Sequence, residues 1–175
     1  MVLITGISAT GKSTVADELA RRFERGVHVR GDVFRRMVVA GREDMTATPS
    51  EEAVRQLRLR YRLGAATADA YHEAGFAVVV QDVVLGPVLA DYVAAIRSRP
   101  LVVVVLAPRP EVVSEREAGR AKVAYRAGHA DIAALDRGLR HETPRLGLWL
   151  DTSAQSPAET VAEILRRGLA EGLVQ

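Results

Sequence analysis

A glycine-rich loop near the start of the chain carries the strongest chemical signal. Its nine residues fit the spacing GxxxxGK[ST]: Gly6, Ile7, Ser8, Ala9, Thr10, Gly11, Lys12, Ser13 and Thr14. In this pattern the loop amides converge on phosphate oxygens, the lysine follows the β- and γ-phosphates, and the next hydroxyl ligates Mg²⁺. The motif therefore predicts that the nine residues bind ATP, that Lys12 offsets charge during phosphoryl transfer, and that Ser13 binds Mg²⁺.

The sequence around the loop agrees with this interpretation. An apolar strand pattern over 2–5 precedes the loop, and an amphipathic helical pattern over 12–25 follows it. A glycine-rich turn that merely opens a helix is the alternative. The chain uses arginine almost everywhere and has lysine only at Lys12 and Lys122. The lysine at the motif position therefore favours the phosphate-binding interpretation.

Two aspartates follow further predicted strands. Asp32 comes after the run 27–30, and Asp82 comes after the run 76–81. In open α/β sheets, ligands bind beside the carboxyl ends of the strands. Asp32 is therefore predicted to be the general base that deprotonates an acceptor hydroxyl, with a helix N-cap as its alternative. Asp82 is predicted to be the carboxylate at the Mg²⁺ site, with a cap of the turn before Gly86 as its alternative.

A third group of candidates lies in an arginine-rich stretch. Residues 109–128 are expected to form a lid over the phosphates, in which Arg116 and Arg120 act on the transferring group and Gly119 and Gly128 serve as hinges. A solvated arginine-rich face is the alternative.

Periodicity predicts one α/β domain over 1–175. Strands are expected over 2–5, 27–30, 76–81, 101–107 and 148–150, and the third and fourth are apolar on both faces, which is typical of a parallel sheet covered by helices. Helices are expected over 12–25, 32–40, 87–97, 111–119 and 131–142. Capping boxes at Thr48–Glu51 and Ser156–Glu159 predict the starts of a long helix reaching about residue 74 and of the final helix.

Composition excludes several other classes of protein. The chain has 175 residues and no cysteine, so a disulfide framework and a thiol nucleophile are excluded. It has no asparagine, which a guanine-reading NKxD motif requires. Length and missing partner motifs argue against transporter ATPases and AAA+ ATPases. No apolar run approaches the ~20 residues of a membrane span. We therefore expect a cytoplasmic protein with no membrane contact.

Five segments in order resemble the chloramphenicol phosphotransferase-like group of small P-loop kinases. They are the loop Gly6–Thr14, Gly31-Asp32-Val33-Phe34, Gln81-Asp82-Val83-Val84-Leu85-Gly86, Glu115-Arg116-Glu117-Ala118-Gly119-Arg120 and Asp151-Thr152-Ser153. The resemblance implies a three-layer P-loop kinase fold, with a five-stranded parallel sheet of order 2-3-1-4-5 and helices on both faces. It also implies transfer of the γ-phosphate of ATP to a hydroxyl of a small molecule.

The same resemblance implies that Asp32 is the acceptor-side base, that Asp82 lies near Mg²⁺, and that Arg116 and Arg120 belong to the lid. Residues 34–53 depart from the chloramphenicol enzyme, so chloramphenicol itself is not the expected acceptor.

Two other functions stay open from the sequence. A polynucleotide 5′-hydroxyl kinase would use the arginines at positions 55, 58 and 62, which fall on one helical face. A solvated face explains that row more simply, and the net charge of only +2 does not require nucleic acid. An ATP-binding switch with little turnover is the other alternative. A metabolite or an antibiotic with a hydroxyl group is the favoured acceptor.

Overall fold

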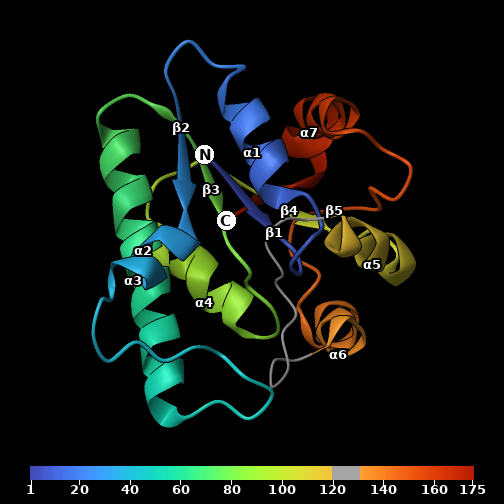
Figure 1. Cartoon of the computed structure of the whole chain (residues 1–175). Coiled ribbons are helices and arrows are strands. Elements are labelled where there is room, and N and C mark those ends of the chain that lie inside the picture. Colours follow the sequence, from blue (N-terminus) through green and yellow to red (C-terminus); the bar gives the residue numbers. More distant parts are fainter. Residues whose placement is uncertain (120–130) are drawn as a thin grey trace.

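A central parallel sheet organises the chain. The computed structural model describes residues 1–119 and 131–175. Five parallel strands lie in the order β2-β3-β1-β4-β5, as expected from the resemblance (Figure 1). Their bounds are β1 Val2–Thr5, β2 Gly26–Arg30, β3 Ala77–Gln81, β4 Leu101–Leu106 and β5 Leu148–Leu150. The predicted P-loop kinase fold is therefore confirmed.

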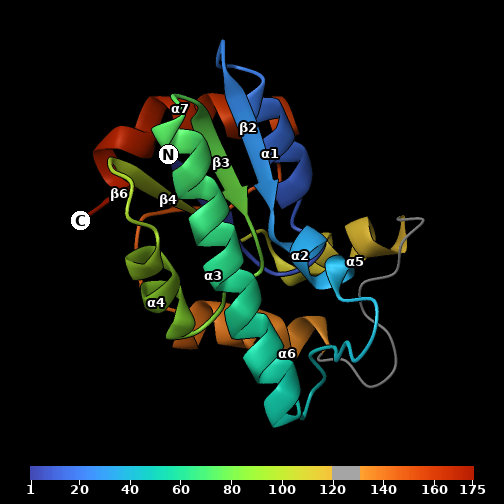
Figure 2. The same ribbon diagram turned by 90° about the vertical axis from the view of Figure 1, so that its left-hand side faces the viewer.

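Helices cover both faces of the sheet because its central strands are apolar on both faces. Helices α1 (Lys12–Ala20) and α7 (Pro157–Glu171) pack on one face, where Ile4 and Val79 belong to the core. Helices α3 (Glu51–Glu73) and α4 (Val88–Ala95) lie on the other face. Figure 2 shows α3 crossing in front of the sheet along its whole height.

Shorter elements gather at the carboxyl ends of the strands. They are α2 (Gly31–Met37), α5 (Pro110–Ala118), α6 (Ile132–Arg137) and a single π-helical turn, η1 (Gly138–Glu142). In Figure 1, α2 and α5 lie on either side of the loop that joins β1 to α1. Among residues 1–119 and 131–175, no helix is long and apolar enough to cross a membrane.

The chain adds a sixth strand that periodicity did not predict. Strand β6 (Leu173–Val174) pairs antiparallel with the first two residues of β4. A two-residue strand is too short to show the alternation on which strand prediction depends.

Several helix boundaries also differ from expectation, including the end of α2 at Met37 instead of residue 40 and of α4 at Ala95 instead of residue 97. Helix α1 ends at Ala20 instead of continuing to residue 25, because the chain reverses there into β2. The turn is tight, since a Cβ on Gly26 would lie 1.8 Å from the carbonyl oxygen of Ala20. Helix α3 begins at Glu51 and is capped by Ser50, whose hydroxyl accepts from the Ala53 amide at 3.0 Å, so the predicted cap at Thr48 is wrong.

The predicted capping box of the last helix is confirmed. The Ser156 amide donates to the Glu159 carboxylate at 2.8 Å, and the Glu159 amide donates back to the Ser156 hydroxyl at 3.3 Å. These two bonds hold the start of α7, which packs against α1 behind the glycine-rich loop.

Candidate functional site

The glycine-rich loop adopts a backbone that its glycines permit. Gly6 has a φ of +144° and Gly11 a φ of +90°, and even Ala9 lies in the left-handed region at +64°. A Cβ on Gly6 would also lie 2.4 Å from the carbonyl oxygen of Leu106 at the end of β4. Glycine is therefore required at position 6 both by conformation and by the close approach of the neighbouring strand.

Two side chains of the loop bind the same backbone carbonyl. The Lys12 ammonium donates to the Ile7 carbonyl oxygen at 2.5 Å, and the Thr10 hydroxyl donates to it at 3.0 Å. Lys12 is buried, with 5% of its surface exposed. Its charge therefore lies across the inside of the loop, beside the first turn of α1, which carries no acidic residue. A buried cation at a helix N-terminus is an environment that favours a bound anion.

Asp32 lies in the first turn of α2, after the carboxyl end of β2. The residue at the helix N-cap is Arg30, so the alternative interpretation of Asp32 as an N-cap is wrong. The Asp32 carboxylate pairs with Arg36 one turn later, at 3.1 Å, and about a third of its side chain is exposed, at 35%. The structure therefore places a partly exposed carboxylate at this edge of the sheet, and its role as a general base stays a prediction.

Asp82 is fully buried on the α3 side of the sheet. Arg60 of α3 donates from Nε to one carboxylate oxygen at 2.8 Å and from Nη2 to the other. The Val83 amide also donates to this carboxylate, at 2.7 Å. The backbone at Gly31 comes so close that a Cβ there would lie 1.9 Å from Asp82 Oδ2. The structure thus places Asp82 with Arg60, and its Mg²⁺ role stays a prediction.

The last residue of β3 contacts Ser13, whose hydroxyl the motif predicts to bind Mg²⁺. The Ser13 hydroxyl donates to Oε1 of Gln81 at 3.0 Å. Sequence reasoning missed Gln81 because an uncharged amide at a strand end gives no signal of its own. It also missed Arg60, which lies among several other arginines of α3. The period-two alternation of a strand was the one available signal, because it places positions 81 and 82 on opposite faces.

Two tyrosines lie next to Arg60 on the α3 side of the sheet. Tyr61 and Tyr92 stack with ring centroids 5.1 Å apart, and the Tyr61 hydroxyl donates to the Val83 carbonyl at 2.7 Å. Burial raises the pKa of Tyr61 to about 12, so it stays neutral at physiological pH. Burial lowers the pKa of Arg60, whereas Asp32 acts in the opposite direction.

Arg116 of α5 reaches across the top of the glycine-rich loop. Its guanidinium donates to the Thr10 carbonyl at 3.5 Å and to the Thr152 carbonyl, after β5, at 2.9 Å. The structure therefore brings Arg116 to the loop. The first part of the expected lid, residues 109–119, is described and contains α5. Arg120 and the remaining part of the expected lid, up to residue 128, lie outside the described residues.

The arginine row on α3 and a hollow beside α1 complete the surface around the site. Arg55, Arg58 and Arg62 are exposed, and Arg55 pairs with Glu52 at 2.7 Å, as expected for a solvated face.

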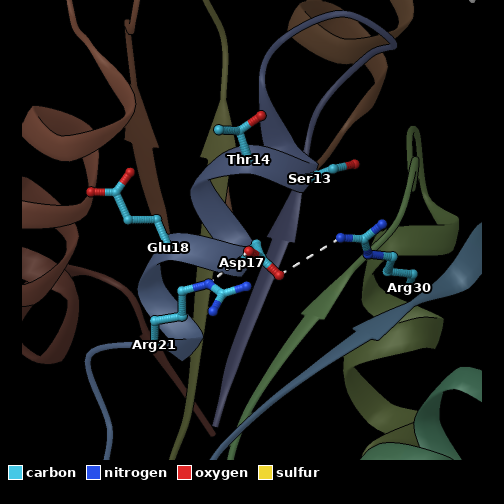
Figure 3. Close-up of a pocket in the computed structure, with 6 residues that line it drawn as sticks. All are labelled: Ser13, Thr14, Asp17, Glu18, Arg21 and Arg30. Atoms are coloured by element: carbon cyan, nitrogen blue, oxygen red, sulfur yellow. Dashed lines mark hydrogen bonds and ion pairs between the residues drawn. The ribbon is translucent and has the colours of Figure 1, made fainter.

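The hollow beside α1 has a volume of about 470 Å³. In Figure 3 the Asp17 carboxylate lies between Arg21 and Arg30 in this hollow, with Ser13 at its upper edge.

Comparisons with known proteins agree with this architecture. The AAA_33 family model, described as an AAA domain, matches residues 1–144. No curated protein matches the chain in sequence.

Several solved structures share the fold at low sequence identity. One is a sugar kinase from Janibacter sp. HTCC2649, with a TM-score of 0.68 and 20% identity over 94% of this chain and 91% of that one. The Mycobacterium tuberculosis APS kinase CysC, solved with AMPPNP and APS, gives 0.67 and 20% identity over 94% of both chains. The Deinococcus radiodurans tunicamycin resistance protein gives 0.63 and 16% identity, over 99% of this chain and 98% of that one. By its fold, its glycine-rich loop and the family model that matches most of it, the chain belongs to the AAA_33 family of P-loop NTPases.

Proposed function

We propose that the protein is an ATP-dependent kinase that transfers the γ-phosphate of ATP to a hydroxyl group of a small molecule. The observation that carries this proposal is the buried Lys12 ammonium, held across a loop whose backbone has the left-handed conformations that the motif requires. The sugar kinase and the APS kinase of the same fold support it by analogy.

The chain supplies suitable groups for both parts of MgATP. Loop residues 6–14 would hold the phosphates, with Lys12 opposite the β- and γ-phosphates. Mg²⁺ takes oxygen ligands, and the Ser13 hydroxyl oxygen, with the Gln81 amide oxygen 3.0 Å away, provides hard oxygen donors at this point. The predicted carboxylate at this site is Asp82. Bound Mg²⁺ would neutralise charge on the phosphate oxygens.

In the proposed reaction the acceptor hydroxyl oxygen forms a bond to the γ-phosphorus as the bond to the bridging oxygen of ADP breaks. Asp32 takes the proton of the hydroxyl group. Lys12 offsets charge on the transferring group, and Arg116 with Arg120 would do the same from the lid side. Because the transition state of phosphoryl transfer is loose, positioning and charge neutralisation supply most of the rate enhancement.

The acceptor is proposed to be a small molecule because the surface does not favour nucleic acid. The exposed arginines of α3 include one that is already neutralised by Glu52. A phosphate-tracking surface would instead present unpaired cations along a continuous stripe.

The test is ATP consumption in Mg²⁺ with a panel of hydroxylated metabolites and antibiotics and a DNA 5′-hydroxyl end. We expect one small acceptor to stimulate ADP formation, and Asp32→Asn to lower that turnover by about 10²–10⁴-fold while ATP still binds. Asp91→Asn, which changes an exposed carboxylate of α4, is the matched control and keeps full turnover. Stimulation of ADP formation only by DNA would overturn the assignment of a small-molecule acceptor. Turnover by Asp32→Asn equal to that of the wild type would overturn the assignment of Asp32 as the general base.

A further inference from the structure

We infer that Gln81, and not the neighbouring Asp82, is the residue of β3 that serves the Mg²⁺ site, by holding the Ser13 hydroxyl in its metal-binding orientation. The inference rests on the proposed binding of MgATP. It assigns Gln81 as a positioning residue and gives Asp82 a separate task on the acceptor side of the sheet.

The register of the sheet separates the two side chains. Gln81 lies beside Ile4 of β1 and Arg30 of β2. Ile4 and Val79 belong to the core cluster under α1 and α7, whereas Val80 belongs to the cluster under α3. Because successive side chains of a strand point to opposite faces, Gln81 faces α1 and the glycine-rich loop, and Asp82 faces α3.

The hydrogen bond between Ser13 and Gln81 has the donor–acceptor direction that a metal site needs. The Ser13 hydroxyl donates its proton to Oε1 of Gln81 at 3.0 Å. The lone pairs of the hydroxyl oxygen are then directed away from Gln81 and are available to a cation. Gln81 is itself held in place, since only 7% of its surface is exposed. A fixed outer partner of this kind orients a metal ligand.

Asp82 is committed elsewhere. Both of its carboxylate oxygens accept from Arg60, one of them also accepts from the Val83 amide, and 1% of the side chain is exposed. The close backbone at Gly31 closes one side of the carboxylate. To reach Ser13, Asp82 would have to leave Arg60 buried without its partner. Its task in this geometry is to hold the Arg60 guanidinium on the α3 side of the sheet.

The experiment compares the affinity of the protein for AMPPNP in excess Mg²⁺ and in EDTA, by titration calorimetry. For each variant the ratio of the two affinities measures the contribution of Mg²⁺. We expect Gln81→Ala to lower this ratio by about 10-fold or more while the affinity in EDTA stays unchanged. Gln81→Glu should retain or raise the ratio, because a carboxylate still accepts from Ser13 and adds negative charge near the cation.

Two further variants make the comparison decisive. Asp82→Asn should leave the ratio within about threefold of the wild type, since the substitution acts on the other face of the sheet. Gln155→Ala removes an amide that bonds to Glu163 and Thr160 on α7, and serves as the matched control without effect. In the absence of Gln81, Ser13→Ala should have less effect on the ratio than it has in the wild type.

The possible failures are distinguishable. If wild-type protein binds AMPPNP in neither condition, the proposed function fails. If it binds and Asp82→Asn abolishes the Mg²⁺ contribution while Gln81→Ala does not, the present inference is overturned and the carboxylate is the metal-site residue. A melting temperature near that of the wild type verifies that each variant is folded. Should Gln81→Ala not fold, a ratio for Gln81→Glu equal to that of Ser13→Ala would likewise overturn the inference.

Discussion

Arg60 in the middle of α3 and Asp82 after the end of β3 form a two-point ion pair that joins the longest helix to the sheet. The pair is almost fully removed from water, with 14% of the Arg60 side chain and 1% of the Asp82 side chain exposed. It therefore differs from the many solvated ion pairs of this arginine-rich chain. Removal of one partner should therefore affect the stability of the fold.

Arg60→Ala should destabilise the protein by about 3–5 kcal/mol, because it leaves the Asp82 carboxylate buried and unpaired. Urea denaturation at neutral pH measures the loss of unfolding free energy. The control is Arg58→Ala on the exposed face of the same helix, where we expect a change within about 0.5 kcal/mol. Equal effects of the two substitutions would show that the buried pair has no special role.

Gly31→Ala should destabilise the protein by about 1–3 kcal/mol, because the added methyl group would overlap the Asp82 carboxylate. Gly138→Ala is the matched control. Gly138 has helical dihedral angles, and the nearest atom to its added Cβ is the flexible Glu142 carboxylate at 4.0 Å. That substitution should be neutral or slightly stabilising. Chemical denaturation of both variants checks the prediction, which a stable Gly31→Ala protein would refute.

Asp69 should contribute a pH-dependent share of stability. It is buried in α3 and accepts from the Arg97 amide at 3.1 Å and the Ser98 amide at 2.9 Å. Burial by itself would raise the pKa of Asp69, but the hydrogen bonds from Ser98 and Arg97 outweigh it and lower the pKa below the ordinary value of 3.8. A lowered pKa means that the carboxylate stabilises the fold above pH 3.8 and that this stabilisation is lost as the pH falls through the folded-state pKa.

The measurement compares the unfolding free energies of wild type and Asp69→Asn from neutral to acidic pH. We expect Asp69→Asn to cost about 1–3 kcal/mol at neutral pH and the difference to narrow in acid. The exposed Asp91→Asn should show no such trend. A difference that is constant with pH would contradict the assignment.

Arg116→Ala should weaken nucleotide binding by about 10-fold or more, because a charged donor over the loop is lost. Arg116→Lys should recover part of the affinity, since it keeps the charge but not the two-point geometry. Calorimetric titration with an ATP analogue provides the measurement. Unchanged affinity in Arg116→Ala would assign the residue to loop packing alone.

The sheet and the phosphate loop were predictable from sequence because each has a strong local signal. All five parallel strands agree within one residue at each end, as strands covered on both faces consist of uninterrupted apolar residues. The N-cap of α3 was harder to predict from the sequence. Thr48 and Ser50 both carry hydroxyls that suit an N-cap, and only tertiary contacts select Ser50.

The inner arrangement of the site was not predictable in the same way. Gln81 and Asp82 are adjacent in sequence, and a carboxylate is the more usual metal ligand. Arg60, which lies 22 positions away in the chain, forms the ion pair that occupies the Asp82 carboxylate. A pairing of this kind is decided by how α3 crosses the sheet, which sequence periodicity does not report.

Strand β6 brings the two ends of the chain together. The Met1 ammonium donates to the Pro100 carbonyl at 3.0 Å, and Val174 pairs with Leu101, so residues 1 and 174 both border the start of β4. A short linker between the ends, with new termini opened in the exposed turn at residues 21–25, would give a circularly permuted protein with the same sheet. In such a protein α1 would carry the new C-terminus, and the phosphate loop would lie near the end of the chain instead of near its start.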